Sequence, residues 1–64
     1  MKYSELKQTT RNSMENLYRG ANPASIKMAL NMKHAELQEL RRFFCTSDID
    51  DIAIRLSTGA YKKD

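Results

Sequence analysis

The chain has 64 residues, of which 41% are hydrophobic and 30% are charged, with two glycines, one proline and a net charge of +3. This length allows one small domain, and the composition argues against a disordered or low-complexity chain and favours a compact helical one. No stretch approaches the ~20 apolar residues of a membrane span, and the N-terminus lacks the apolar segment of a signal peptide. We therefore expect a cytoplasmic protein with no membrane partner.

The first predicted helix covers residues 4–19, with Ser4 as its N-cap and Gly20 as its C-terminal cap. Its apolar face is thin, so the helix depends on packing against the rest of the chain. Amide and basic side chains gather on its polar side. They are candidate nucleic-acid contacts, because amides can read adenine edges and arginine can bind phosphate, although a solvated polar face explains them equally: Lys7, Gln8, Arg11, Asn12, Asn16 and Arg19.

The second predicted helix covers residues 23–44 and begins at the clearest local signal of the chain, an N-cap Asn22 followed by Pro23. Apolar residues stay in helical phase from Ile26 to Phe44 without needing a break. The resulting apolar surface is broader than two short helices can cover, so we expect a homodimer. Its predicted partner or dimer interface consists of Met28, Met32, Leu40, Phe43 and Phe44.

The same segment offers an alternative, because residues 23–42 resemble the apolar frame of a repressor-type helix-turn-helix with Asn31 at the turn. Asparagine tolerates the left-handed conformation that such a turn requires. Two features depart from the pattern: Lys27 stands where a small residue is usual, and the second helix would begin near Lys33 without a Ser, Thr or Asp cap. We favour one continuous helix, since the residues around Asn31 are good helix formers.

The third predicted helix covers residues 48–57. Ser47 and Asp50 have the spacing of a capping box, and acidic residues favour the first turn of a helix. Gly59 ends the helix, and residues 60–64 are predicted to form a loose tail.

Chemistry-bearing residues are scarce. His34 and Cys45 are the single members of their kinds, with no spacing typical of a metal site. Cys45 follows two phenylalanines and is predicted to be a small buried side chain at a helix end. We expect no enzymatic activity, no metal and no cofactor.

The sequence thus predicts an all-α single domain over residues 1–64, in which a long central helix joins two shorter ones. Six basic residues accompany two acidic ones up to Ala35, against five and six in the remainder, so the positive charge lies in the N-terminal half. The leading hypothesis is a small regulatory protein that acts by contact, as a homodimer and with a larger protein, in the manner of phage or mobile-element accessory proteins; an antitoxin is a variant of it. The alternative is a DNA-binding transcriptional regulator built on the helix-turn-helix at residues 23–42.

Overall fold

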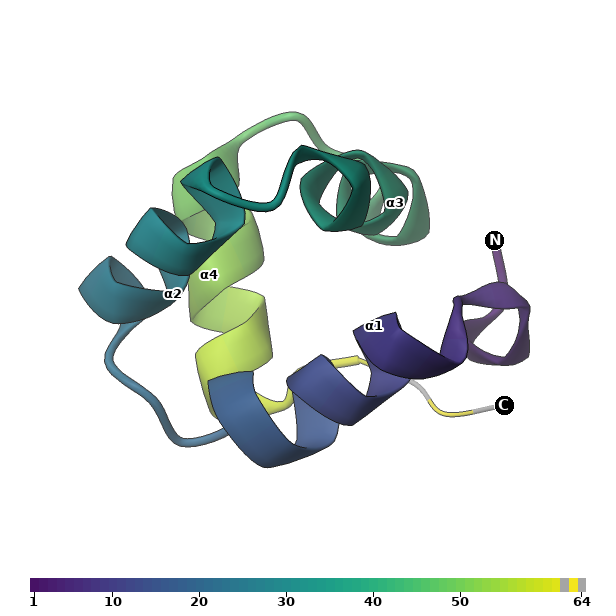
Figure 1. Ribbon diagram of the computed structural model, residues 1–64, viewed down its shortest axis with the longest axis horizontal. Helices are drawn as coiled ribbons and strands as arrows, with labels where there is room; N and C mark the ends of the chain where they lie inside the picture. The colour runs from purple at the N-terminus through teal and green to yellow at the C-terminus, as the bar shows by residue number, and fades with distance from the viewer. Residues whose placement is uncertain (62, 64) are drawn as a thin grey trace.

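The computed structural model describes residues 1–61 and 63. All of its secondary structure over these residues is helical, and they form no strand. The predicted all-α class is confirmed. In chain order the elements are a 3₁₀ turn η1 (Tyr3–Glu5), α1 (Gln8–Ser13), a π-helical turn η2 (Met14–Tyr18), α2 (Pro23–Asn31), α3 (His34–Phe44) and α4 (Ile49–Thr58) (Figure 1). Within the described residues, none of the helices is both long enough and apolar enough to cross a bilayer.

The first predicted helix is interrupted near its start. η1 ends at Glu5, and the chain is extended at Leu6 and Lys7 before α1 begins. The reason is a long-range cap: the buried Glu39 carboxylate of α3 accepts the Lys7 backbone N–H at 2.8 Å and the Thr10 hydroxyl. A carboxylate at the positive end of a helix is favourable, so α3 fixes where α1 begins.

The first segment also changes its helical phase. After α1 the chain continues into the wider η2, in which Met14 and Tyr18 are both buried while Leu17 is half exposed. A helix of ordinary pitch would place Leu17 on the same face as Leu6 and Met14. The π-helical turn takes more residues per turn, so it turns Leu17 outward and brings Tyr18 into the core.

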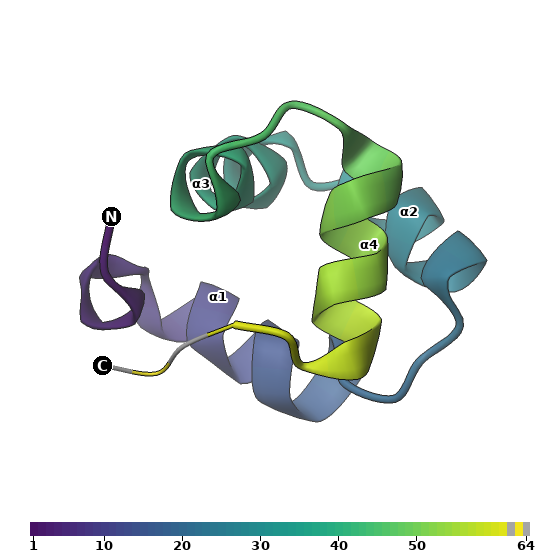
Figure 2. The same cartoon turned by 180° about the vertical axis from the view of Figure 1, so that it is seen from behind.

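The predicted continuous helix over residues 23–44 is wrong. α2 begins as expected, with the Asn22 side chain accepting the Ala24 N–H at 2.9 Å and Pro23 in the first turn. It ends at Asn31, and a link of Met32 and Lys33 leads into α3. Figure 1 shows the change of direction, since α3 is seen almost end-on while α2 is seen from the side; Figure 2 shows the same pair from behind. The turn needs no left-handed residue, because Met32 has φ −93° and Lys33 has φ −129°.

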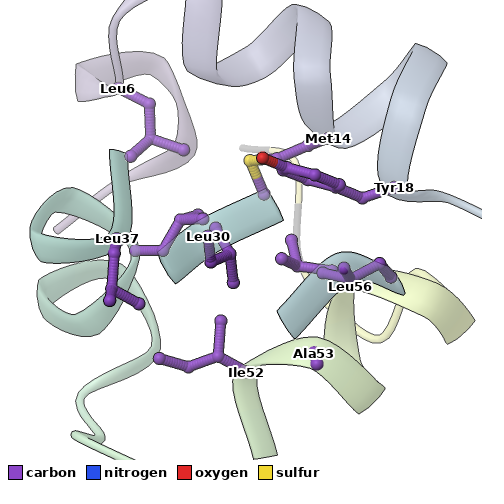
Figure 3. Packing of buried hydrophobic residues seen from close by; sticks show 10 residues of the cluster. Leu6, Met14, Tyr18, Leu30, Leu37, Ile52, Ala53 and Leu56 are labelled. Carbon is purple, nitrogen blue, oxygen red and sulfur yellow. The ribbon is translucent and has the colours of Figure 1, made fainter. Parts of the chain in front are cut away.

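Burial in the core explains this break. Ile26 and Leu30 of α2 and Leu37 and Leu40 of α3 are all buried in one cluster. Figure 3 shows Leu30 and Leu37 meeting Met14, Tyr18 and the α4 side chains from different directions. A straight helix of 22 residues would carry Leu37 and Leu40 past this core. The bend allows Leu37 and Leu40 to be buried in the core. The free energy gained by this burial exceeds the free energy of the few backbone hydrogen bonds that are lost at the link.

α4 lies close to the predicted position and packs chiefly on α2. Its N-cap is Asp48, whose side chain accepts the Asp50 N–H at 3.0 Å, rather than the expected Ser47. Gly59 ends it with a φ of 72°, a left-handed conformation suited to glycine. Its inner face supplies three core residues, Ile52, Ala53 and Leu56.

Two predictions about helix ends fail. Cys45 is exposed and ends α3 with a φ of 56°, because the cap conformation turns its side chain away from the core. The loose tail is also wrong where the structure describes it: the Tyr61 ring stacks on Tyr3 with centroids 6.0 Å apart, and its hydroxyl donates to Glu15 at 2.7 Å. Lys63 forms an ion pair with the same carboxylate at 2.5 Å. Residues 62 and 64 of the predicted tail lie outside the described residues.

Candidate nucleic-acid interface

The outer side of α3 carries a polar stripe. His34, Gln38 and Arg42 are exposed and follow one another at four-residue intervals, so they share one face of the helix. Lys33, at the N-cap position, extends this face toward the start of α3. We call these four residues the α3 stripe; three of them can be cationic and the fourth is an amide.

The acidic residues of α3 point the other way. The buried Glu39 caps α1, as described above, and Glu36 accepts a hydrogen bond from the Tyr18 hydroxyl. Burial and this carboxylate raise the pKa of Tyr18, so the phenol remains a donor at neutral pH. Because both carboxylates are held on the inner side, the outer face of this described helix presents basic and amide groups.

A small pocket marks the N-terminal end of the α3 stripe. It has a volume of about 310 Å³, and α1, the link and α3 all contribute to its lining. Lys7 and Lys33 line it together with His34, although Lys7 is far from the other two in the sequence. The first backbone N–H groups of α3 have no side-chain cap from Lys33. Glu36 and the buried Glu39 line the same pocket, so its charge is mixed, with Lys33 and His34 of the α3 stripe among its basic groups.

The N-terminal residues predicted to contact nucleic acid are only partly brought together with this face. Arg11 folds back onto the carbonyl oxygens of Ser4 and Leu6, at 3.0 and 2.6 Å. Arg19 pairs with Glu15 at 3.4 Å. Gln8 donates to Asn12 at 3.2 Å, while Asn12 and Asn16 remain exposed. Of this set, Lys7 alone lines the pocket at the start of α3.

The residues predicted to form a dimer interface do not make one surface. Met28 of α2 and Met32 of the link are 69% and 85% exposed, whereas Leu40 is fully buried within the chain. Phe43 and Phe44 are partly buried, because Tyr3 and Tyr61 cover them. The apolar surface expected to need a second copy is thus largely covered within one chain, apart from the two methionines.

The structure resolves one of the two departures from the helix-turn-helix pattern. Lys27 does not separate the helices, because its ammonium group extends toward α4 and pairs with Asp50 at 2.7 Å, a contact that raises the pKa of Lys27. The second departure remains: Lys33 provides no side-chain cap, and Glu36 is the acidic residue in the first turn of α3. The four-residue spacing of His34, Gln38 and Arg42 places them on one flank from the sequence alone, but the predicted site residues did not include them. The signal was the absence of acidic residues from that flank.

No protein-family model, curated protein or solved structure matches the chain. Among the described residues, no group of three or more His, Cys, Asp or Glu side chains has a geometry that could hold a metal ion. A functional assignment therefore rests on the arrangement of the α3 stripe and the pocket at its start.

Proposed function

We propose that the protein is a DNA-binding transcriptional regulator in which α2 and α3 act as a helix-turn-helix, with α3 entering the major groove. The observation that carries the proposal is the asymmetry of α3: His34, Gln38 and Arg42 are exposed on one face, while Glu36 and Glu39 are hydrogen-bonded within the chain. The short link of Met32 and Lys33 between the two helices supports it as well.

Each residue of the α3 stripe has a chemically distinct task in this proposal. Gln38 in the middle of α3 can form a bidentate contact with adenine, and Arg42 can do so with guanine. Lys33 and Lys7 bind backbone phosphate near the start of α3 through their exposed side chains. His34 lies between the base-reading residues and the phosphate-binding lysines. It contacts a base or a phosphate, depending on how deeply α3 inserts into the groove.

The test is selection of duplexes from a random-sequence pool, followed by fluorescence-anisotropy titration at two salt concentrations. We expect sub-micromolar binding to a selected sequence that persists at the higher salt. Gln38→Ala should relax discrimination at one base pair by ~1–3 kcal/mol. Asn12→Ala is the matched control, because Asn12 is an exposed amide on α1 outside the α3 stripe. Binding that selects no sequence, or that responds to Asn12→Ala alone, contradicts the proposal.

A second candidate function is regulation by protein contact, through a homodimer or a larger partner. The specific observation in its favour is the exposure of Met28 of α2 and Met32 of the link. Exposed methionines are adaptable apolar contacts and are common at protein-binding surfaces. A dimer is also compatible with DNA binding, since many helix-turn-helix proteins bind two half-sites.

A further inference from the structure

An open pocket of about 750 Å³ lies where the N-terminal residues, the end of α3 and the chain after α4 meet. Aromatic rings and two basic residues dominate its lining: Lys2, Tyr3, Phe43, Phe44, Arg55 and Tyr61. Its volume falls within the range of small-molecule sites. The pocket shares no residue with the α3 stripe, so its function is independent of DNA binding.

The four rings brace one another in fixed orientations. Phe43 meets Phe44 edge-to-face with centroids 4.9 Å apart, and Tyr61 meets Phe44 edge-to-face at 6.1 Å. The hydroxyl of Tyr61 is in turn anchored by Glu15, which does not line the pocket. Edge-to-face packing of this kind creates a pre-formed apolar wall that suits another planar ring.

The charged residues among the described lining of the pocket, Lys2 and Arg55, are both basic. The Arg55 guanidinium carbon lies 5.9 Å from the centre of the Phe44 ring, and its Nε contacts Asp51 at 3.2 Å. This arrangement holds the guanidinium at the aromatic wall and leaves its two terminal nitrogens without a partner among the described residues. None of the described residues that line the pocket is acidic. An anion bound there therefore meets the guanidinium as a donor, while Asp51, which pairs with its Nε, does not line the pocket.

We propose that this pocket binds an aromatic anion, that is, a planar ring system carrying a carboxylate or a phosphate. The ring packs on Phe43, Phe44 and the tyrosines, and the anionic group pairs with the terminal nitrogens of Arg55. Aromatic carboxylic acids and mononucleotides share this chemistry. The experiment distinguishes them by using one probe of each kind.

The test is an NMR titration of the full-length ¹⁵N-labelled chain with indole-3-acetate and, separately, with adenosine monophosphate. Indole-3-acetamide and adenosine are the neutral counterparts. We expect saturable shifts at Tyr3, Phe43 and Gly59 with at least one anion, and binding of its neutral counterpart about tenfold weaker. Shifts with indole-3-acetate alone assign the site to carboxylates, and shifts with the nucleotide alone assign it to phosphates.

Variants isolate the two parts of the pocket. Arg55→Gln should abolish the tenfold preference for the anion, Arg55→Lys should keep part of it, and Phe44→Leu should weaken the charged and neutral probes alike. Lys27→Gln is the control, because it removes a cationic side chain that pairs with Asp50 and does not line the pocket, and it should leave the preference intact. No saturable shift with either anion, equal affinity for the neutral probes, or an unchanged preference in a folded Arg55→Gln variant overturns the proposal.

Discussion

Cys45 ends α3 in a left-handed conformation that an L-residue adopts at a cost. Its φ is 56°, and among the described residues it is the one non-glycine with a positive φ. Its N–H and that of Thr46 both donate to the Arg41 carbonyl, so the cap geometry is fixed by the backbone. The exposed thiol contributes no burial that would be lost on substitution.

Cys45→Gly should therefore stabilise the protein by about 1 kcal/mol, since glycine removes the steric cost of the left-handed conformation. Cys45→Ala, which keeps the Cβ atom, is the control and should change stability little. Urea denaturation of the three proteins measures the difference. A loss of stability in Cys45→Gly would show that this residue does not adopt the left-handed conformation.

Glu15 links the two ends of the described chain, and its titration should be visible in stability. Hydrogen bonds from Lys63 and Tyr61 hold the pKa of this carboxyl below its ordinary value. Its contribution is thus present above the unfolded-state pKa and is lost as pH falls through the lower folded-state pKa. The carboxylate is partly exposed, so the contribution should stay below ~1 kcal/mol.

We expect Glu15→Gln to reduce the loss of unfolding free energy that accompanies acidification from about pH 7 to about pH 3. Denaturant titrations at both pH values provide the measurement. An identical loss in the wild type and in Glu15→Gln would mean that the contacts with Tyr61 and Lys63 contribute nothing to folding.

At the scale of elements, local signals predicted helix starts and ends well where one residue type determines them. Asn22 with Pro23 begins α2, and Gly59 ends α4. The break at Met32 and Lys33 lacks such a signal, because the surrounding residues favour a helix and tertiary burial overrides them. The cap that Glu39 provides for α1 joins residues 29 and 32 positions apart, which periodicity cannot reveal.

The break can be tested with proline. His34 is the first residue of α3, where proline is tolerated, and Lys33 before it already lies outside the α region. His34→Pro should change the free energy of unfolding by less than about 1 kcal/mol, whereas a helix running through this position would lose ~3 kcal/mol or more. Ala29→Pro, in the body of α2, is the control and should show the large loss. A comparable loss in both variants would restore the continuous helix.

The substitution Asn31→Ala independently tests the backbone conformation at the link between α2 and α3. Asn31 is the last residue of α2 and has no positive φ. Alanine should thus be neutral or stabilising by a few tenths of a kcal/mol, as the better helix former. A loss of ~1 kcal/mol in thermal or urea denaturation would indicate a left-handed turn at Asn31 instead.

At the scale of the whole molecule, the candidate site shows the same division between local and tertiary information. Helical periodicity places His34, Gln38 and Arg42 on one flank. It cannot show that Lys7 joins them at the start of α3, because that contact depends on the packing of α1 against α3. Phe43 and Phe44 were expected to be covered by a second copy of the chain. Tyr3 and Tyr61 of the same chain cover them instead, through tertiary contacts that helical periodicity does not reveal.

The proposed homodimer would have to bury Met28 and Met32, the exposed members of its predicted interface. Sedimentation equilibrium at micromolar concentration should show a dimer for the wild type and a monomer for the double substitution Met28→Lys and Met32→Lys. Both side chains are exposed, so the double variant should keep its melting temperature at low concentration. A wild-type protein that sediments as a 7.4 kDa monomer and melts cooperatively would exclude this interface.

The most direct test of the account is to map where duplex DNA contacts the folded chain. An NMR titration of the ¹⁵N-labelled protein with a selected duplex should shift the amides of Lys33, His34, Gln38 and Arg42, together with Lys7. The amide signals of α4 should not shift, since α4 packs against α2 and contributes no residue to the α3 stripe. Shifts confined to the exposed amides of α1, Asn12 and Asn16, or spread evenly over the described surface, would contradict α3 as the recognition helix.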